Sequence, residues 1–397
     1  MPLVHNGFPA MDIFEEENRE MKSRENQLME LIGSIGDLDQ EAMRAASDRQ
    51  AYLAKPPGSL GKLEDITVKL AGITGQIKND VKNQAIVVMS ADNGVVVEGV
   101  ASAPQAVTLS QTINMTRRIT GVSSMAKYYD FPLLVIDVGV SMEIPEELYT
   151  DSMLDEKGQV TNKIVNRRLA DGTDNLAKGP AMSREKAVEA MLIGIDAVKA
   201  FKDAGVTLFG IGEMGIGNTT TSSAVLSAIT GADAEAVVGR GGGLQDEGLA
   251  KKIEIVHRAA KRCKGMDPIG ILAEIGGFDL CAMTGAFLAA GIYRIPVVID
   301  GLISIVAANM AKELNPKAVD FMFASHKSYE IGYKTAMDRL GLFPMFDLSM
   351  RLGEGSGCPI AFKIIETATA TMNLMWLLDE ASIDAGYLEE IREKNLF

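Results

Sequence analysis

Cysteine and histidine are scarce in this chain of 397 residues. Its three cysteines lie far apart in the sequence, and its three histidines do not stand at the spacing of metal ligands. Disulfide frameworks and structural zinc sites are built from clusters of these residues. The sequence therefore indicates neither kind of cross-link, and a chain of this length can instead bury a large hydrophobic core.

The chain is also poor in positive charge. It has 39 Lys and Arg against 53 Asp and Glu, which gives a formal net charge of −14. Such a balance argues against a general binding surface for nucleic acid or for anionic membranes. A phosphate-bearing ligand would have to be held by local dipoles and a few cations.

No segment has the pattern of a signal peptide or of a membrane span. The N-terminus lacks a basic region followed by an apolar one. The most apolar stretch, residues 280–311, is interrupted by Arg294, Pro296 and Asp300, and it is typical of a helix, a buried strand and a second helix. We expect a cytoplasmic protein that binds neither nucleic acid nor membranes.

Two well-known phosphate-binding motifs are absent from residues 206–231, a glycine-rich segment. It has no lysine after its second glycine cluster, as a P-loop requires, and its spacing is not GxGxxG. A dinucleotide-dependent enzyme is therefore disfavoured. Residues 206–210 nevertheless have strand character, residues 212–217 are glycine-rich, and Asn218 begins a helix-like stretch. A helix that opens behind glycines offers free backbone N–H groups to a phosphate.

Glu213 stands inside this glycine-rich loop. A carboxylate that faces a phosphate-binding loop is unfavourable unless it serves chemistry or contacts another part of the substrate. The hydroxyls of Thr219, Thr220 and Thr221 would add hydrogen-bond donors for the phosphate. The segment thus predicts a phosphate site with a carboxylate beside it.

Six apolar runs resemble buried strands of a parallel sheet. They cover residues 85–90, 133–138, 206–210, 236–239, 296–300 and 319–324. Each contains or is closely followed by a polar residue at its carboxyl end, in chain order Asp92, Asp137, Glu213, Arg240, Asp300 and Ser325. Ligands of open parallel sheets bind outside the carboxyl ends of the strands. The pattern predicts an α/β fold with an open, mostly parallel, Rossmann-like sheet flanked by helices, and one site at its carboxyl edge.

Further candidates lie between the predicted strands. Gln111, on a helix expected over residues 105–120, has an amide suited to the edge of a planar heterocycle. Arg240 precedes three glycines that would let the backbone approach a ligand closely. The glycine pair 276–277 precedes a helix of small residues, and Glu354 stands between two glycines before another helix.

Eight motifs occur in an order that resembles one known family. They are KPPGSLGKLE, ADNGVVVEGV, GPAMS, GEMGIGNTTT, GGFDLCAMTG, PVVIDG, ASH and MRLGEGSG. In this order they are similar to the nicotinate-nucleotide:dimethylbenzimidazole phosphoribosyltransferases, the CobT family of cobalamin nucleotide-loop assembly. The resemblance runs from Lys55 to the C-terminus, and it is specific because the ordered set carries it.

The resemblance implies transfer of the phosphoribosyl group from nicotinate mononucleotide to a lower-ligand base. The products would be an α-ribazole 5′-phosphate and nicotinate. It also implies a homodimer whose subunit has a large α/β nucleotide-binding domain, residues 61–346. A small helical domain would combine residues 1–60 with residues 347–397.

The same resemblance assigns roles to individual residues. Glu354 matches the catalytic base and Glu213 the second active-site carboxylate. It assigns phosphate and ribose binding to Gly215, Asn218, Thr219, Lys252 and Ser325. The glycine-rich segments add Gly217, Thr220, Arg240, Gly241, Gly276 and Gly277 as further candidates for the same role. Base binding would fall to Asp92, Asn93, Ala103, Gln111, Met350 and Leu352.

The chemistry of the reaction agrees with two carboxylates. A benzimidazole nitrogen becomes a good nucleophile only when it loses its proton, so a carboxylate within hydrogen-bond reach is the expected general base. Departure of nicotinate leaves an oxocarbenium-like sugar carbon, which nearby negative charge from Glu213 would stabilise. Because the leaving group is already cationic, we expect neither a metal ion nor a cofactor.

The sequence departs from the family pattern at a few positions. Asn93 stands where a histidine is usual, and asparagine keeps hydrogen bonding but cannot titrate near neutrality. Ala103 stands where some members have a serine near the base. These differences leave open a purine, another benzimidazole or a phenolic acceptor. They also leave open a heteromer with a paralogous subunit and a non-catalytic nucleotide-binding subunit.

Overall fold

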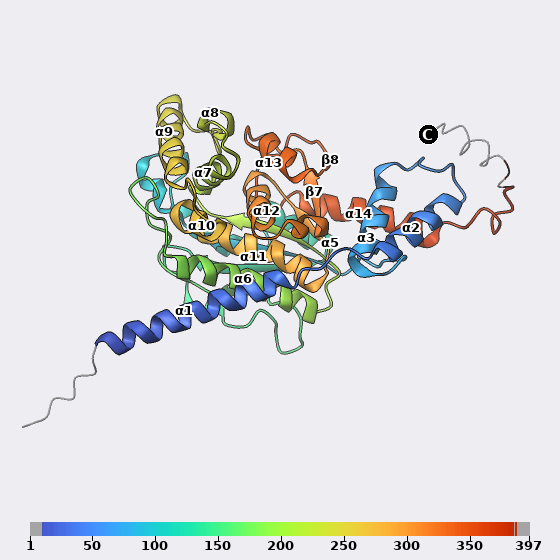
Figure 1. Cartoon of the computed structure of the whole chain (residues 1–397), viewed down its shortest axis with the longest axis horizontal. Helices are drawn as coiled ribbons and strands as arrows, with labels where there is room; N and C mark the ends of the chain where they lie inside the picture. Colours follow the sequence, from blue (N-terminus) through green and yellow to red (C-terminus); the bar gives the residue numbers. More distant parts are fainter. Residues whose placement is uncertain (1–9, 385, 387–397) are drawn as a thin grey trace, which may run out of the picture.

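The computed structural model describes residues 10–384 and 386, and its centre is a single sheet of eight strands (Figure 1). All neighbouring strands are parallel, in the order β3-β4-β2-β1-β5-β6-β7-β8. The strands are β1 Gln84–Ala91, β2 Leu133–Gly139, β3 Tyr149–Thr150, β4 Ile164–Asn166, β5 Leu208–Met214, β6 Val297–Ile299, β7 Met322–His326 and β8 Pro344–Phe346. The predicted α/β class with an open parallel sheet is confirmed.

Helices surround the sheet and form most of the remaining structure (Figure 1). The α-helices are α1 Ala10–Gly33, α2 Gln40–Tyr52, α3 Lys62–Thr74, α4 Ala106–Thr116, α5 Gly121–Tyr129, α6 Arg184–Asp203, α7 Asn218–Thr230, α8 Ala234–Val237, α9 Asp246–Arg262, α10 Pro268–Ile275, α11 Phe278–Tyr293, α12 Leu302–Leu314, α13 Tyr333–Leu340 and α14 Cys358–Leu374. The 3-10 helices are η1 Gly94–Glu98, η2 Glu146–Leu148 and η3 Pro316–Phe321. No helix of the described part of the chain is long and apolar enough to span a membrane.

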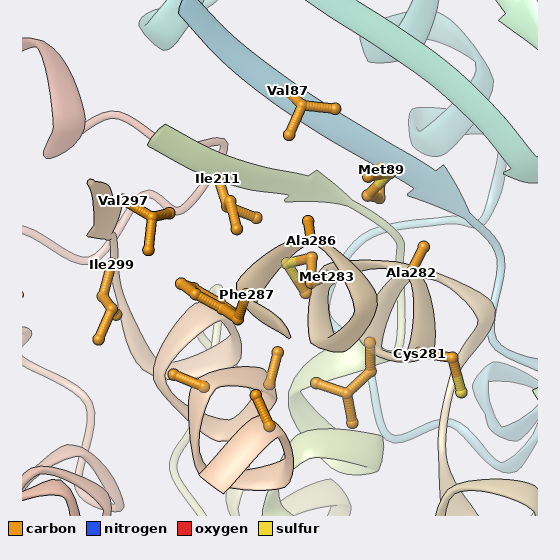
Figure 2. Close-up of a cluster of buried hydrophobic side chains, with 14 of the residues drawn as sticks. Val87, Met89, Ile211, Cys281, Ala282, Met283, Ala286, Phe287, Val297 and Ile299 are labelled. Carbon is orange, nitrogen blue, oxygen red and sulfur yellow. The ribbon is translucent and has the colours of Figure 1, made fainter. Parts of the chain in front are cut away.

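The two faces of the sheet centre carry different partners. Figure 2 shows Ile211 of β5 directed toward α11, together with side chains from β1 and β6. Alternate residues of a strand point to opposite faces. Accordingly, a Cβ added to Gly210 would meet Cys358 of α14 at 2.6 Å. Strand β5 therefore lies between α11 on one face and the start of α14 on the other.

Helix α11 is almost entirely buried because α6 covers its outer side. The two helices approach closely at glycines. A Cβ on Gly194 of α6 would overlap the carbonyl oxygen of Ala282, and one on Gly285 of α11 would overlap that of Met191. Small residues thus allow backbone-to-backbone packing beneath the sheet.

Helices from both ends of the described chain meet beside the sheet. Helix α2 packs on α3, and α3 packs on α14 (Figure 1). Ala46, Ala71 and Met372 belong to a buried cluster that joins the three helices. Helix α1 lies instead along α6. These contacts accord with a helical unit built from both ends of the chain. The predicted domain boundaries stay a prediction: a small domain of residues 1–60 and 347–397, and a large domain of residues 61–346.

Some local predictions differ from the structure. Residues 236–239 were expected to form a strand, which is wrong, because residues 234–237 form α8. The backbone N–H groups of Ala236 and Val238 donate to the carbonyl oxygens of Asp233 and Ala234, so they are used within a helical turn and not in the sheet. The polar connection 141–180 contains β3 and β4, which its lack of apolar alternation concealed.

The contact between α6 and α11 makes a stability prediction. Gly194→Ala should lower the urea midpoint and reduce the free energy of unfolding by about 1 to 3 kcal/mol, the usual cost of overpacking a rigid core. Gly270→Ala in α10 is the matched control, because its added Cβ would lie 3.5 Å from its nearest neighbour. Alanine there should be neutral or stabilising, since it favours helix more than glycine does. Equal midpoints for the two variants would contradict the packing described here.

Candidate active site

A cavity of about 330 Å³ opens at the carboxyl ends of β5, β6 and β7. This is the edge where ligands of parallel sheets bind. Eleven residues predicted for the site line it: Ala103, Gln111, Glu213, Gly215, Gly217, Asn218, Thr219, Arg240, Gly241, Leu352 and Glu354. Segments far apart in the chain therefore meet in one cavity.

The glycine loop connects β5 to the N-terminus of α7. Gly217 precedes the helix with φ 97°, a left-handed conformation that favours glycine. Gly215 must also be small, because a Cβ there would lie 2.9 Å from the Asp279 carboxylate and overlap the Ala91 carbonyl oxygen. The loop brings the start of α7 to the cavity wall, where backbone N–H groups attract anions.

Asn93 supports this loop from behind and does not line the cavity. Its Oδ1 accepts a hydrogen bond of 3.0 Å from the Thr221 hydroxyl. A Cβ added to Gly217 would lie 3.2 Å from the Asn93 Cβ. The Asn93 side chain is 1% exposed. The position that differs from the family pattern is thus in the scaffold of the glycine loop.

Lys252 does not line the cavity, but it contacts Thr219, which does. Its Nζ donates 2.9 Å to the Thr219 hydroxyl and 3.1 Å to the Gly239 carbonyl oxygen. Burial lowers the pKa of Lys252 to about 8. In the ligand-free state this cation therefore orients Thr219, which does line the cavity.

Glu213 is the penultimate residue of β5, and its carboxylate shares a partner with another acid. The Asn218 side-chain amide donates to Glu213 Oε2 and, at 3.1 Å, to Asp279 Oδ2. Burial and the neighbouring Asp279 carboxylate raise the pKa of Glu213 to about 8. Burial also raises the pKa of Asp279 to about 6. Glu213 and Asp279 share one amide donor and have no cation between them, so the folded protein favours a state in which this pair retains a proton.

Glu354 reaches the same cavity from a loop more than a hundred residues later in the chain. Its backbone N–H donates 3.3 Å to Glu213 Oε1, and its Oε2 accepts 3.1 Å from the Val122 backbone N–H. Val122 lies in the first turn of α5, where anions are stabilised. Gly212 makes the approach possible, since a Cβ there would overlap the Glu354 carbonyl oxygen. Within one subunit, the Glu354 backbone is thus bonded to Glu213 and its side chain to the start of α5.

Two of the polar strand ends serve the neighbouring connection and not the cavity. Asp92 Oδ2 accepts 2.8 Å bonds from the backbone N–H and the hydroxyl of Ser141. Asp137 Oδ1 accepts from the backbone N–H groups of Gly139 and Val140, and its Oδ2 accepts from the Tyr149 hydroxyl. The carboxyl edge therefore has a ligand side, at the ends of β5, β6 and β7, and an anchoring side, at the ends of β1 and β2.

The remaining predicted residues also lie outside the cavity lining. The Ser325 hydroxyl is 3.0 Å from His326 Nδ1, directly behind the wall. Thr220 is buried in α7. Gly276 and Gly277 lead into α11, and Met350 accepts a backbone bond from Tyr329.

Sequence reasoning missed several residues that line the cavity. Arg351 and Glu330 were not singled out, nor was the start of α12 at Gly301. Asp300 was noted only as a strand end. Asp279 lies outside the lining and pairs with Glu213 through Asn218; it was not singled out, although it belongs to the quoted motif GGFDLCAMTG. Their apolar or turn-like surroundings carry no recognisable signal, although Arg351 lies inside the quoted motif MRLGEGSG. No group of three or more His, Cys, Asp or Glu residues within 10–384 and 386 is arranged to hold a metal ion.

Comparison with known proteins supplies further findings. A family model described as "Phosphoribosyltransferase" matches residues 35–383. A nicotinate-nucleotide–dimethylbenzimidazole phosphoribosyltransferase of Clostridium perfringens is 48% identical over 372 residues, which are 93% of this chain and 99% of that protein. One of the same name from Ruminiclostridium cellulolyticum is 46% identical over 89% of this chain and 97% of its own length.

The fold also matches a solved structure. The crystal structure of CobT from Thermus thermophilus superimposes with a TM-score of 0.81 at 37% sequence identity. The match covers 87% of this chain and 99% of that one. Sequence and structure comparisons therefore agree over nearly the whole length of the relatives.

The buried acids predict how stability depends on pH. Burial also raises the pKa of Asp300, to about 7. A carboxyl whose pKa is raised on folding binds its proton more tightly in the folded state, so its stabilising effect is present at low pH and is lost as the pH rises from about 4 through the folded value. Between about pH 5 and pH 8, the ligand-free protein should therefore lose stability through Glu213, Asp279 and Asp300 as the pH increases.

Asp279→Asn tests this expectation. Asparagine has no proton to lose, so the unfolding temperature of the variant relative to the parent should rise steadily across this pH range. Asp48→Asn, on the exposed side of α2, is the control and should show a constant difference. A constant difference for Asp279→Asn as well would contradict the assignment of a retained proton to this pair.

Proposed function

This chain belongs to the family of nicotinate-nucleotide–dimethylbenzimidazole phosphoribosyltransferases, and on that basis we propose that it transfers the phosphoribosyl group of nicotinate mononucleotide to dimethylbenzimidazole. The products are nicotinate, which is released, and α-ribazole 5′-phosphate, which is used in cobalamin nucleotide-loop assembly. One observation carries the proposal: Glu354 and Glu213 line the same cavity as the glycine loop at the start of α7.

Glu354 acts as the general base. It takes the proton of one benzimidazole nitrogen while the other nitrogen attacks the sugar carbon, so the ring becomes a stronger nucleophile as the bond forms. Support comes from the fixed position of the carboxylate, which is 5% exposed and held by the Val122 backbone N–H. A side chain immobilised in this way loses little entropy when the acceptor arrives.

Glu213 stabilises positive charge at the reacting sugar. Burial and Asp279 raise its pKa to about 8 in the ligand-free protein, so it holds a proton near neutrality. The pyridinium of nicotinate mononucleotide is a cation, and a nearby cation lowers the pKa of a carboxyl group. Substrate binding therefore ionises Glu213, and its charge then faces the oxocarbenium-like transition state.

The 5′-phosphate binds at the glycine loop. The N-terminus of α7 supplies backbone donors there, and Thr219 adds a hydroxyl that Lys252 orients. Arg240 and Arg351 are the cations on the cavity wall. Local donors of this kind are what an acidic protein with a net charge of −14 needs to hold an anionic ligand.

The acceptor base lies on the apolar side of the cavity. Val100, Val107 and Leu352 line that part, with Gln111 as the neighbouring amide and Ala103 in place of a larger or polar group. A planar aromatic ring suits apolar walls with one polar group to orient it. Asn93 is not in the lining, so its influence on acceptor choice would be exerted through the glycine loop.

The assembly and location complete the proposal. We infer a homodimer that works in the cytoplasm without nucleic-acid or membrane partners and without a metal ion. A heteromer with a paralogous subunit is the alternative assembly. Light scattering of the purified chain distinguishes a self-associated dimer from a monomer that awaits a partner.

Turnover with nicotinate mononucleotide and dimethylbenzimidazole tests the function. The parent should release nicotinate and form α-ribazole 5′-phosphate in the presence of a metal chelator. Glu354→Gln should lower kcat by at least about a hundredfold, the size of lost general-base catalysis. Glu366→Gln is the matched control, because Glu366 is a partly buried, hydrogen-bonded carboxylate in α14 outside the cavity, and it should keep parental kcat. Parental kcat in Glu354→Gln would remove this residue from the mechanism.

A further inference from the structure

Asp300, directly after β6, binds the loop that carries Glu354. Its Oδ1 accepts a 2.7 Å hydrogen bond from the Gly357 backbone N–H, and its Oδ2 accepts one of 3.0 Å from the Gly355 backbone N–H. The side chain is 2% exposed. Leaving a buried acceptor without its donors costs the desolvation free energy of that group, so the two bonds restrain the loop.

The loop needs such a restraint because its backbone is unusual. Gly353, Glu354 and Gly355 all have positive φ, of 84°, 63° and 90°. Glycine adopts this region readily, but glutamate does so at a cost. A costly conformation persists only where the surroundings over-determine it. Without its acceptors the loop would relax toward ordinary φ values, and the Glu354 side chain would turn with it.

The residues around Gly357 leave no room for a side chain at that position. A Cβ added to Gly357 would lie 2.9 Å from Asp300 Oδ1, 2.6 Å from the Ser325 hydroxyl, and would overlap His326 Nδ1. The N–H of Gly357 can thus come close to the carboxylate only because no side chain intervenes. Asp300 and the glycine at 357 form one contact.

We propose that Asp300 is a positioning residue that holds residues 353–357 through two backbone hydrogen bonds and thereby aims the Glu354 carboxylate at the acceptor base. Both of its carboxylate oxygens are engaged by the loop, so it acts through Glu354 and not on the substrate. This inference rests on the proposed function, and it extends that function to a residue that does not itself take part in the proton transfer.

Asp300→Asn is the direct test. Asparagine keeps one acceptor oxygen but turns an N–H₂ group toward the second backbone N–H, so one bond is lost. We expect kcat to fall about 10- to 100-fold, as for a small misplacement of a catalytic group, with KM for nicotinate mononucleotide within about threefold of the parent. Asp137→Asn is the matched control, because Asp137 is also a buried strand end that accepts two backbone N–H bonds, but outside the cavity. It should keep parental kcat.

A double-mutant cycle separates positioning from direct action. In a Glu354→Gln background, Asp300→Asn should reduce the residual turnover by less than about twofold, because the group that it positions is gone. Equal factors in both backgrounds would overturn the proposal, and so would a kcat for Asp300→Asn equal to that of Asp137→Asn.

Hydrogen exchange gives a readout that does not need turnover. Peptides covering residues 350–360 should exchange faster in Asp300→Asn than in the parent, and unchanged exchange there would overturn the proposal. If Asp300→Asn does not fold, Gly357→Ala breaks the same contact from the loop side and should give the same loss of kcat. A parent that releases no nicotinate would refute the proposed function, while the exchange result would still decide whether Asp300 holds the loop.

Discussion

The structure of the site depends on hydrogen bonds between buried carboxylates and the backbone of residues 353–357. Glu213 at the end of β5 accepts from the Glu354 N–H, and Asp300 after β6 accepts from Gly355 and Gly357. A protein interior tolerates such polar groups only where hydrogen-bond partners surround them. The loop supplies those donors, so the strand ends and the loop stabilise each other, and the Glu354 side chain is held in the cavity lining as a consequence.

This constraint explains why so many glycines gather at one edge of the sheet. The backbone of residues 353–357 can lie on β5 only if Gly212 has no side chain, and its turn requires residues that tolerate positive φ. The same edge must also leave N–H groups free at α7 for an anion. Glycine satisfies both requirements, close packing of the backbone and free N–H donors, and this accounts for the motifs around Gly212–Gly217 and Gly353–Gly357.

Much of this was predictable from the sequence, for reasons that differ between elements. The long strands β1, β2 and β5 each contain an apolar run, so their existence followed from burial on both faces. Glu213, Asn218 and Glu354 were identified because glycine-rich motifs surround them. Strands β3, β4 and β8, at or next to the sheet edges, have two or three residues each and no alternation to detect.

The parts that could not be predicted depend on which side chains meet in space. Asp92, Asp137 and Asp300 all stand at the ends of apolar runs, yet only Asp300 lines the cavity, because sheet order puts β1 and β2 on the anchoring side. Asp279 pairs with Glu213 through Asn218, which no spacing in the sequence reveals. Spatial order within the sheet therefore decided the roles of otherwise similar residues.

The most direct test of this account is a crystal structure with α-ribazole 5′-phosphate bound. We expect a Glu354 carboxylate oxygen within hydrogen-bond distance, about 3 Å, of the benzimidazole nitrogen that is not joined to the sugar, with the phosphate at the start of α7. A product whose ring lies beyond about 5 Å from that carboxylate, too far for a direct proton transfer, would contradict it.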